Sequence, residues 1–222
     1  MTTPRFEVLT SQTHFDMLKE KHSSELVGVV DQKRTLDDTC STYFGYVLSG
    51  FCHLTPSSLP RFELIKGMYF SLPGKIEIDS SHGKVVVFRK PNYIGLTTFG
   101  GPIEKEGRLL YIDSCKATNL INPAKVGDPC LHLLTFPPNI VQSSHTHPSL
   151  RFGVVAGGSG YCLRPNQDKL PLTPGMVFNL PAGCAHSFES LTDGLKVIAY
   201  HPDSDVGPTD EIHQMKFATH LI

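Results

Sequence analysis

Two blocks of this sequence recur at one fixed distance along the chain. Residues 44–50 read Phe-Gly-Tyr-Val-Leu-Ser-Gly, and residues 152–158 read Phe-Gly-Val-Val-Ala-Gly-Gly. Residues 67–73 (GMYFSLP) and 175–181 (GMVFNLP) form the second pair. The differences 152 − 44 and 175 − 67 are both 108. Because both pairs share one offset, the pattern predicts an internal duplication of one structural unit.

The duplication predicts two similar domains, at residues 1–105 and 106–222. We place the join near residues 95–107, because the run Gly100-Gly101-Pro102 would break a strand.

Short apolar runs of four to seven residues follow one another from Leu26 onward, separated by Gly, Pro, Asn, Asp and Ser. Such regular spacing of short runs predicts an all-β sandwich or barrel. Residues 11–22 differ: a Ser or Thr cap precedes Phe15 and Leu18, and we expect a short N-terminal helix that starts near Thr13.

Charge and hydropathy narrow the classes of partner. The formal net charge is −1, so nothing electrostatic favours nucleic acid or an anionic membrane as a partner. No apolar run reaches the length of a membrane span, and the N-terminus lacks the apolar core of a signal peptide. We therefore expect a cytoplasmic protein. Its six cysteines lack paired spacing, which favours free thiols.

Three histidines suggest a metal site. His145 and His147 are two positions apart, so a strand would point both side chains to one face. His186, beyond a turn, could complete that face from a neighbouring strand. Three neutral imidazoles suit a divalent transition metal such as iron, zinc, nickel or manganese. The alternative is three core histidines that hydrogen bonds satisfy without a metal.

The first copy has lost these ligands. At the offset of 108, His145 and His147 correspond to Asp37 and Thr39, and His186 corresponds to Ile78. The first copy is therefore interpreted as a structural half, although a cavity for a metal-free small molecule there stays open as an alternative.

The second copy resembles the cupins, a superfamily of double-stranded β-helix barrels. The run His145-Thr-His147 is similar to the first cupin motif. The run Gly175-x5-Pro181-Ala-Gly183-Cys-Ala-His186 is similar to the second. With the repeat, this resemblance implies a bicupin of two such barrels that keeps the metal motif only in the C-terminal one. It also implies a homodimer formed through edge strands.

The family's usual fourth ligand, a glutamate, is replaced by Arg151, which cannot ligate a metal. A centre of three histidines resembles the non-haem iron dioxygenases that cleave diketones or oxidise thiols. The resemblance therefore implies Fe(II), with Zn, Ni or Mn as alternatives, and a small acidic, dicarbonyl or thiol substrate. Two other functions remain open: a metal-dependent isomerase or lyase of a sugar or organic acid, and a non-catalytic binding protein.

Further residues are candidates for the site. Arg151 could clamp an acidic substrate in two-pronged fashion, or could turn away and pair with an acid. Tyr161, just past a glycine-rich turn, could donate to oxygen or substrate, or could be an ordinary strand tyrosine. His132 could act as a base beside the metal or be a core histidine, and His201 is expected to be solvated. Four phenylalanines could wall a pocket or fill the core: Phe136, Phe152, Phe178 and Phe188.

Overall fold

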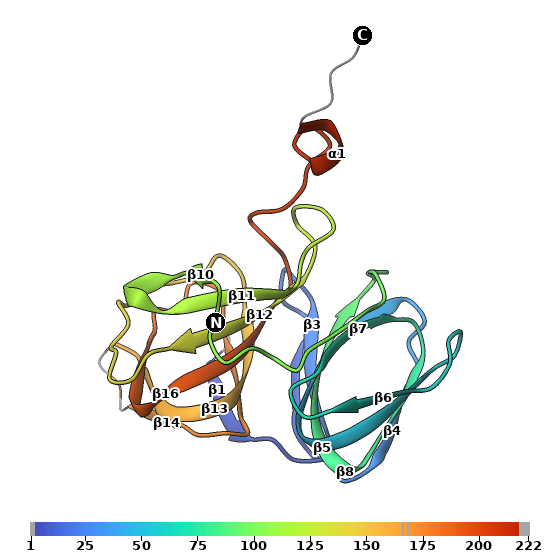
Figure 1. Cartoon of the computed structure of the whole chain (residues 1–222), viewed down its shortest axis with the longest axis horizontal. Coiled ribbons are helices and arrows are strands. Elements are labelled where there is room, and N and C mark those ends of the chain that lie inside the picture. The colour runs from blue at the N-terminus through green and yellow to red at the C-terminus, as the bar shows by residue number, and fades with distance from the viewer. Residues whose placement is uncertain (1–2, 166, 168, 218–222) are drawn as a thin grey trace.

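The computed structural model describes residues 3–165, 167 and 169–217. Within these ranges the chain is almost entirely β, with sixteen strands in two sheets of eight. Figure 1 shows each sheet curled on itself and the two lying side by side. The all-β prediction is confirmed.

The first sheet contains strands β2 to β9, and its main path runs β2-β3-β8-β5-β7-β9, with β4 on β8 and β6 on β5. Its two long strands, β5 and β8, pair with each other along most of their length. The strands are β2 (His14–Met17), β3 (Ser24–Val30), β4 (Lys33–Leu36), β5 (Ser41–Pro56), β6 (Phe62–Ile65), β7 (Tyr69–Pro73), β8 (Ile76–Pro91) and β9 (Thr98–Gly100).

The second sheet runs β1-β15-β13-β16-β12-β11-β10, with β14 on β13. It contains β1 (Arg5–Val8), β10 (Leu109–Leu110), β11 (Lys116–Ile121), β12 (Cys130–Phe136), β13 (Arg151–Leu163), β14 (Leu170–Leu172), β15 (Met176–Leu180) and β16 (Ser187–His201).

The N-terminal strand β1 joins the sheet built from the end of the chain, where it pairs antiparallel with β15. The backbone amide of Arg5 donates to Asn179 Oδ1 at 2.6 Å, and the ring of Phe6 stacks on Phe178 with centroids 5.5 Å apart. The linking strand β9 pairs with β7, the counterpart of β15 in the first sheet. The division of the chain at residue 105 stays a prediction.

The two repeated blocks occupy matching strands with matching partners. Gly45 on β5 lies opposite Phe70 on β7, and Gly153 on β13 lies opposite Phe178 on β15. In each pair the phenylalanine ring crosses the glycine so closely that an added Cβ would meet ring carbon Cζ at 2.2 Å in the first copy and 2.1 Å in the second. The glycine of each repeated Phe-Gly motif therefore lies where a phenylalanine ring of the neighbouring strand leaves no room for a Cβ.

The two sheets pack face to face through an aromatic core. Phe88 of the first sheet stacks on Tyr200 of the second with ring centroids 5.2 Å apart and planes 4° apart, and Phe152 lies beside both rings. All three side chains are fully buried. Burial of this apolar surface holds the two sheets together.

The predicted N-terminal helix is wrong. Residues His14–Met17 form strand β2, which pairs with β3. The sequence alternates exposed and buried side chains there, with Phe15 and Met17 in the core. A period of two fits a strand, and the candidate cap Thr13 instead accepts a hydrogen bond from the backbone of Thr10 in a turn.

The helices of the described residues are a 3-10 turn, η1 (Ile112–Ser114), and the short α1 (Gln214–Phe217). In this described part of the chain, neither is long and apolar enough to cross a membrane. All six cysteines are free, as expected from their spacing.

Candidate metal centre

Two backbone hydrogen bonds hold His145 against His186. The amide of His145 donates to the carbonyl of His186 at 2.9 Å, and the amide of His186 donates back at 3.0 Å. The pair forms an isolated antiparallel bridge between the segment before β13 and the turn before β16. Gly183 donates its amide to the carbonyl of His147 at 2.9 Å, which anchors the third histidine to the same turn.

The three imidazoles of His145, His147 and His186 converge. Their ring centroids lie 5.0 Å, 4.7 Å and 5.2 Å apart in the three pairs. One nitrogen from each ring lies within 4.8 Å of the others. The structure therefore brings together the three histidines that the sequence singled out.

Backbone carbonyls set the orientation of two of the rings. His145 Nδ1 donates to the carbonyl of Ser143 at 2.9 Å, and His186 Nδ1 donates to the carbonyl of Cys184 at 2.9 Å. Both rings then carry their proton on Nδ1, which leaves the Nε2 lone pair free for a metal. The Ser143 amide is held in turn by the carboxylate of Asp113.

Burial keeps two of these rings neutral. Desolvation lowers the pKa of His147 to about 3 and that of His186 to about 4, and the positive charge of Arg151 adds to both effects. Neutral imidazole is the form that binds a transition metal. Donor type, spacing and protonation therefore all fit one divalent ion, such as iron, zinc, nickel or manganese.

The histidines open into a cavity of about 260 Å³ inside the second sheet. Its walls are mostly apolar, and they include Phe152, Phe178 and Phe188, three of the four phenylalanines for which pocket wall and core were both open. Phe136 is instead buried against Phe188, with ring centroids 5.7 Å apart. The cavity suits a small molecule with one polar end.

Arg151 lines this cavity but is also tied to the protein. Its Nη1 donates to the carbonyl of Leu150 at 2.9 Å and to the hydroxyl of Ser149, and lies 3.9 Å from the carboxylate of Asp203. Its Nε is buried without a partner in the described structure. One arm of the guanidinium is therefore occupied while the side chain still lines the cavity, and the substrate clamp stays a prediction.

Tyr161 is not among the described residues that line the cavity. Along β13 the alternation of side chains buries Cys162 in the core and turns Tyr161 to the other face, where the ammonium of Lys169 lies 5.5 Å from its ring centroid. Its predicted contact with substrate therefore gains no support from the structure.

A different tyrosine, Tyr111, reaches the cavity from the turn before η1. Its ring lies edge-on to His145 at 6.5 Å between centroids, and burial raises its pKa, so the phenol stays protonated and can donate a hydrogen bond. No sequence signal pointed to it, because Tyr111 lies 34 positions before His145 in a segment without a motif.

Gln142 is a second cavity residue to which no sequence motif points. Its side chain is 2% exposed, lines the cavity, and has neither amide atom hydrogen-bonded within the described structure. A buried amide without partners is costly, and such groups call for a ligand. Gln142 therefore offers a donor and an acceptor to a bound molecule beside the three histidines.

His132 and His201 also line the cavity, and their ring centroids are 4.5 Å apart. His201 was expected to be solvated as a tail residue, and this was wrong, because it is the last residue of β16 and its side chain points into the cavity. Desolvation lowers the pKa of His132 to about 4 and holds that of His201 well below the ordinary value for histidine.

The first sheet encloses apolar side chains where the second has its cavity. Val27, Tyr43, Phe70 and Ile78, the residue at the position of His186, are part of one buried cluster there. This composition agrees with a structural role for the first copy.

No protein-family model and no curated protein matches this sequence. Solved structures do share its fold. A cupin 2 conserved barrel domain protein from Leptotrichia buccalis superposes with a TM-score of 0.60 at 12% identity, over 89% of this chain and 88% of that one.

Two enzymes superpose as well. Oxalate decarboxylase from Bacillus subtilis, a protein with Mn(II) centres, gives a TM-score of 0.56 at 10% identity, over 91% of this chain and 76% of its own. Salicylate 1,2-dioxygenase from Pseudoaminobacter salicylatoxidans gives 0.58 at 10% identity, over 80% and 70%. At such identities the likeness establishes the cupin fold alone.

Proposed function

We propose that this chain is a bicupin enzyme whose second barrel holds one divalent metal ion on His145, His147 and His186. Its reaction is the oxygen-dependent cleavage or oxidation of a small acidic, dicarbonyl or thiol compound, with Fe(II) as the favoured ion. The single observation that carries the proposal is the convergence of three imidazoles on a small apolar cavity, with no carboxylate among the described residues that line it.

The donor set explains the preference for an acidic substrate. Three neutral ligands leave the charge of a divalent ion uncompensated, so an anionic chelating group binds there favourably. The buried guanidinium of Arg151 adds a second positive charge to the same cavity. When bound, the ion supplies Lewis acidity and, in the case of iron, the redox chemistry of the reaction.

The chain's own residues would orient the substrate. Gln142 offers one donor and one acceptor, and Tyr111 offers a phenolic proton from beside His145. The apolar walls exclude water from the rest of the cavity. Salicylate 1,2-dioxygenase shares the fold, and this supports an oxygenase without fixing the substrate.

The test begins with metal content. The protein loaded with Fe(II) without oxygen should hold one triad-bound iron, and His147→Ala should lose it, while His53→Ala, a surface histidine paired with Glu63, should keep it. Oxygen uptake is then followed with a panel of β-diketones, aromatic hydroxy acids and thiol acids. A metal-loaded protein that consumes no oxygen with any of them would contradict the dioxygenase.

A metal-dependent lyase or isomerase is the second candidate. Oxalate decarboxylase has the same fold, and the cavity's positive charge would serve a carboxylate substrate equally well. Product formation without oxygen uptake, with Mn(II) or Zn(II) in place of iron, would favour this alternative. A metal-loaded protein that binds such acids and converts none would favour a binding protein.

We also propose a homodimer formed through edge strands. The measurement is the mass of the purified protein by sedimentation or light scattering.

A further inference from the structure

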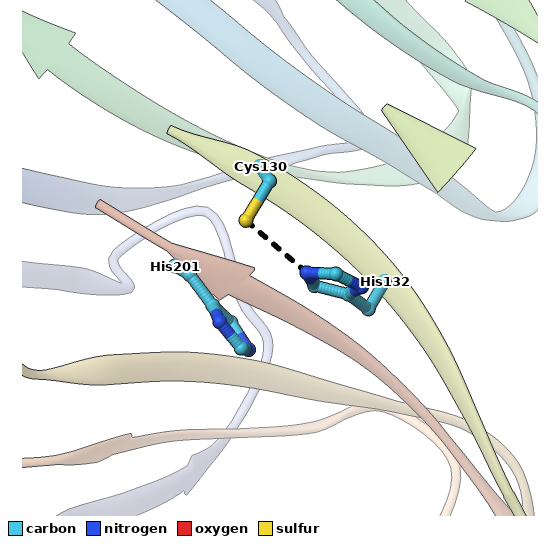
Figure 2. Close-up of side chains that lie close together, drawn as sticks. All are labelled: Cys130, His132 and His201. Carbon is cyan, nitrogen blue, oxygen red and sulfur yellow. Dashed lines mark hydrogen bonds between the residues drawn. The ribbon is translucent and has the colours of Figure 1, made fainter. Parts of the chain in front are cut away.

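A second group of side chains that could hold a metal lies beside the same cavity, and two of its three members line that cavity. Cys130 and His132 are two positions apart on β12, so they share a face. His201 on β16 is the direct cross-strand partner of Cys130. Figure 2 shows the three side chains pointing toward one another from these two strands.

The distances between their donor atoms suit one ion. Cys130 Sγ lies 3.1 Å from His132 Nε2, and one donor atom from each of the three residues lies within 4.8 Å of the others. Metal–sulfur and metal–nitrogen bonds of about 2.3 and 2.0 Å place two such donors about 3.5 Å apart around a tetrahedral ion. Small side-chain rotations would therefore seat an ion among them.

A neighbouring amide fixes the orientation of one ligand. His132 Nδ1 donates to Asn119 Oδ1 on the adjacent strand β11 at 2.8 Å. This bond places the ring proton on Nδ1 and turns the Nε2 lone pair toward Cys130. Metal-binding histidines in proteins are held in this way by a hydrogen bond from the other ring nitrogen.

The first sheet has different residues at the positions that correspond to Cys130, His132 and His201. Phe44 pairs with Phe88 on β8 just as Phe152 pairs with Tyr200 on β16, so the residue after Phe88, Arg89, is the counterpart of His201. Its cross-strand partner is Glu25, the counterpart of Cys130, and the two form an ion pair. The third position, that of His132, is Val27.

In the first copy, the opposite charges of Arg89 and Glu25 therefore compensate each other. The second copy replaces both with metal-binding side chains and adds a third, His132, where the first has a valine. Cys130 is 3% exposed, whereas His132 and His201 line the cavity. An ion bound here would therefore have the thiolate on its buried side and an open coordination position toward the cavity.

We propose that Cys130, His132 and His201 form a second metal site, separate from the three-histidine centre, that takes a thiophilic divalent ion such as zinc. One thiolate and two imidazoles favour zinc over magnesium, calcium or manganese. Binding forms a metal–sulfur bond and releases the thiol proton to water. The rings of His147 and His201 are 6.3 Å apart, so two ions would share one cavity.

The test uses Co(II) as a spectroscopic substitute for zinc. Metal-free protein titrated with Co(II) should bind two equivalents and develop a thiolate-to-cobalt charge-transfer band in the near ultraviolet. Cys130→Ala should lose the band and about one equivalent of metal. Cys162→Ala, which removes an equally buried thiol from the same sheet, should keep both.

A third variant distinguishes metal binding at the second site from metal binding at the three-histidine centre. His147→Ala should lose the equivalent bound at the three-histidine centre and keep the band, so failure of the proposed enzyme would leave this result unaffected. A wild-type titration without the band, or a band that survives in Cys130→Ala, would overturn the second site. Should a variant fail to fold, X-ray absorption of the zinc-loaded wild type decides, through the presence or absence of a sulfur neighbour at about 2.3 Å.

Discussion

His145 and His186 are joined backbone to backbone, each donating its amide to the other's carbonyl, although neither belongs to a regular strand. This pairing sets their rings 4.7 Å apart. Two backbone hydrogen bonds thus fix the distance between the segments that carry these two rings.

Metal removal should therefore leave the centre's backbone intact. After chelation, hydrogen exchange at the amides of His145 and His186 should remain slow, because their acceptors are protein carbonyls. Adding an ion back at 100 times its Kd should raise the free energy of unfolding by about 2.7 kcal/mol. Rapid exchange at both amides in the metal-free protein would contradict this account.

Loss of the hydroxyl should lower turnover at Tyr111 but not at Tyr161. Tyr111→Phe removes a donor from the cavity and should lower the turnover of the metal-loaded protein by roughly tenfold, the loss of about one hydrogen bond. Tyr161→Phe removes a hydroxyl from the outer face of β13 and should change nothing. Rates for both variants with any substrate found by the oxygen-uptake panel check this, and equal losses would argue against it.

Arg151 should govern the affinity for anions. In the metal-loaded protein, Arg151→Gln should weaken the binding of oxalate by about 10- to 100-fold, since a buried hydrogen bond to a charged group contributes about 1.5–3 kcal/mol. Calorimetric titration with oxalate measures the affinity, and elemental analysis confirms that the ion is retained. Unchanged oxalate affinity at full metal occupancy would remove Arg151 from the site.

Acid should destabilise the metal-free protein. Burial lowers the pKa of His132 and His186 to about 4 and that of His147 to about 3, whereas unfolded histidine titrates near 6.5. As the pH falls below about 6.5, the unfolded chain takes up protons that the folded chain excludes, so stability present above that pH is lost. At pH 5 the loss is up to about 2 kcal/mol per histidine.

Urea unfolding at pH 7 and pH 5 measures this loss. His186→Asn should show a smaller difference between the two pH values than the wild type. The control is His53→Asn, outside the cavity, which should keep most of the wild-type difference because the three buried histidines remain.

The crossing of Gly153 by the Phe178 ring predicts a large effect from one methyl group. Gly153→Ala should lower the free energy of unfolding by about 1–3 kcal/mol, the usual cost of overpacking a core, because its Cβ would overlap the ring. Gly157→Ala, on the same strand with its nearest neighbour 4.0 Å away, should cost far less. The double variant Gly153→Ala with Phe178→Leu should recover part of the loss.

The strand pattern, the duplication and the three histidines could be predicted from the sequence, because short apolar runs, two repeated blocks and two histidine-bearing motifs are each visible in the residue order. The Phe-Gly repeat succeeded for a physical reason, since the ring crossing forbids any other residue at Gly45 and Gly153. The helix at residues 11–22 failed because four residues of alternating burial, His14–Met17, are too few to outweigh a plausible cap.

Three cavity residues could not be predicted from the sequence. Tyr111, Gln142 and His201 reach the cavity from a turn, a connecting segment and the last residue of a strand, and no local pattern joins them to the histidine motifs. The prediction for Tyr161 rests on its place after a glycine-rich turn, which does not determine the direction of the side chain. Only the register of β13, with its irregularity between Gly158 and Gly160, decides which face it occupies.

The pairing of β1 with β15 has a consequence for any attempt to separate the halves of this protein. Cutting the polypeptide near residue 105 would leave the fragment that carries the histidines with an unpaired sheet edge at β15. The partner of that edge, β1, would remain on the other fragment. Simple truncation therefore cannot isolate a complete second barrel. A rearranged gene, in which residues 3–9 follow residue 217 through a linker, would restore the lost edge strand to that fragment.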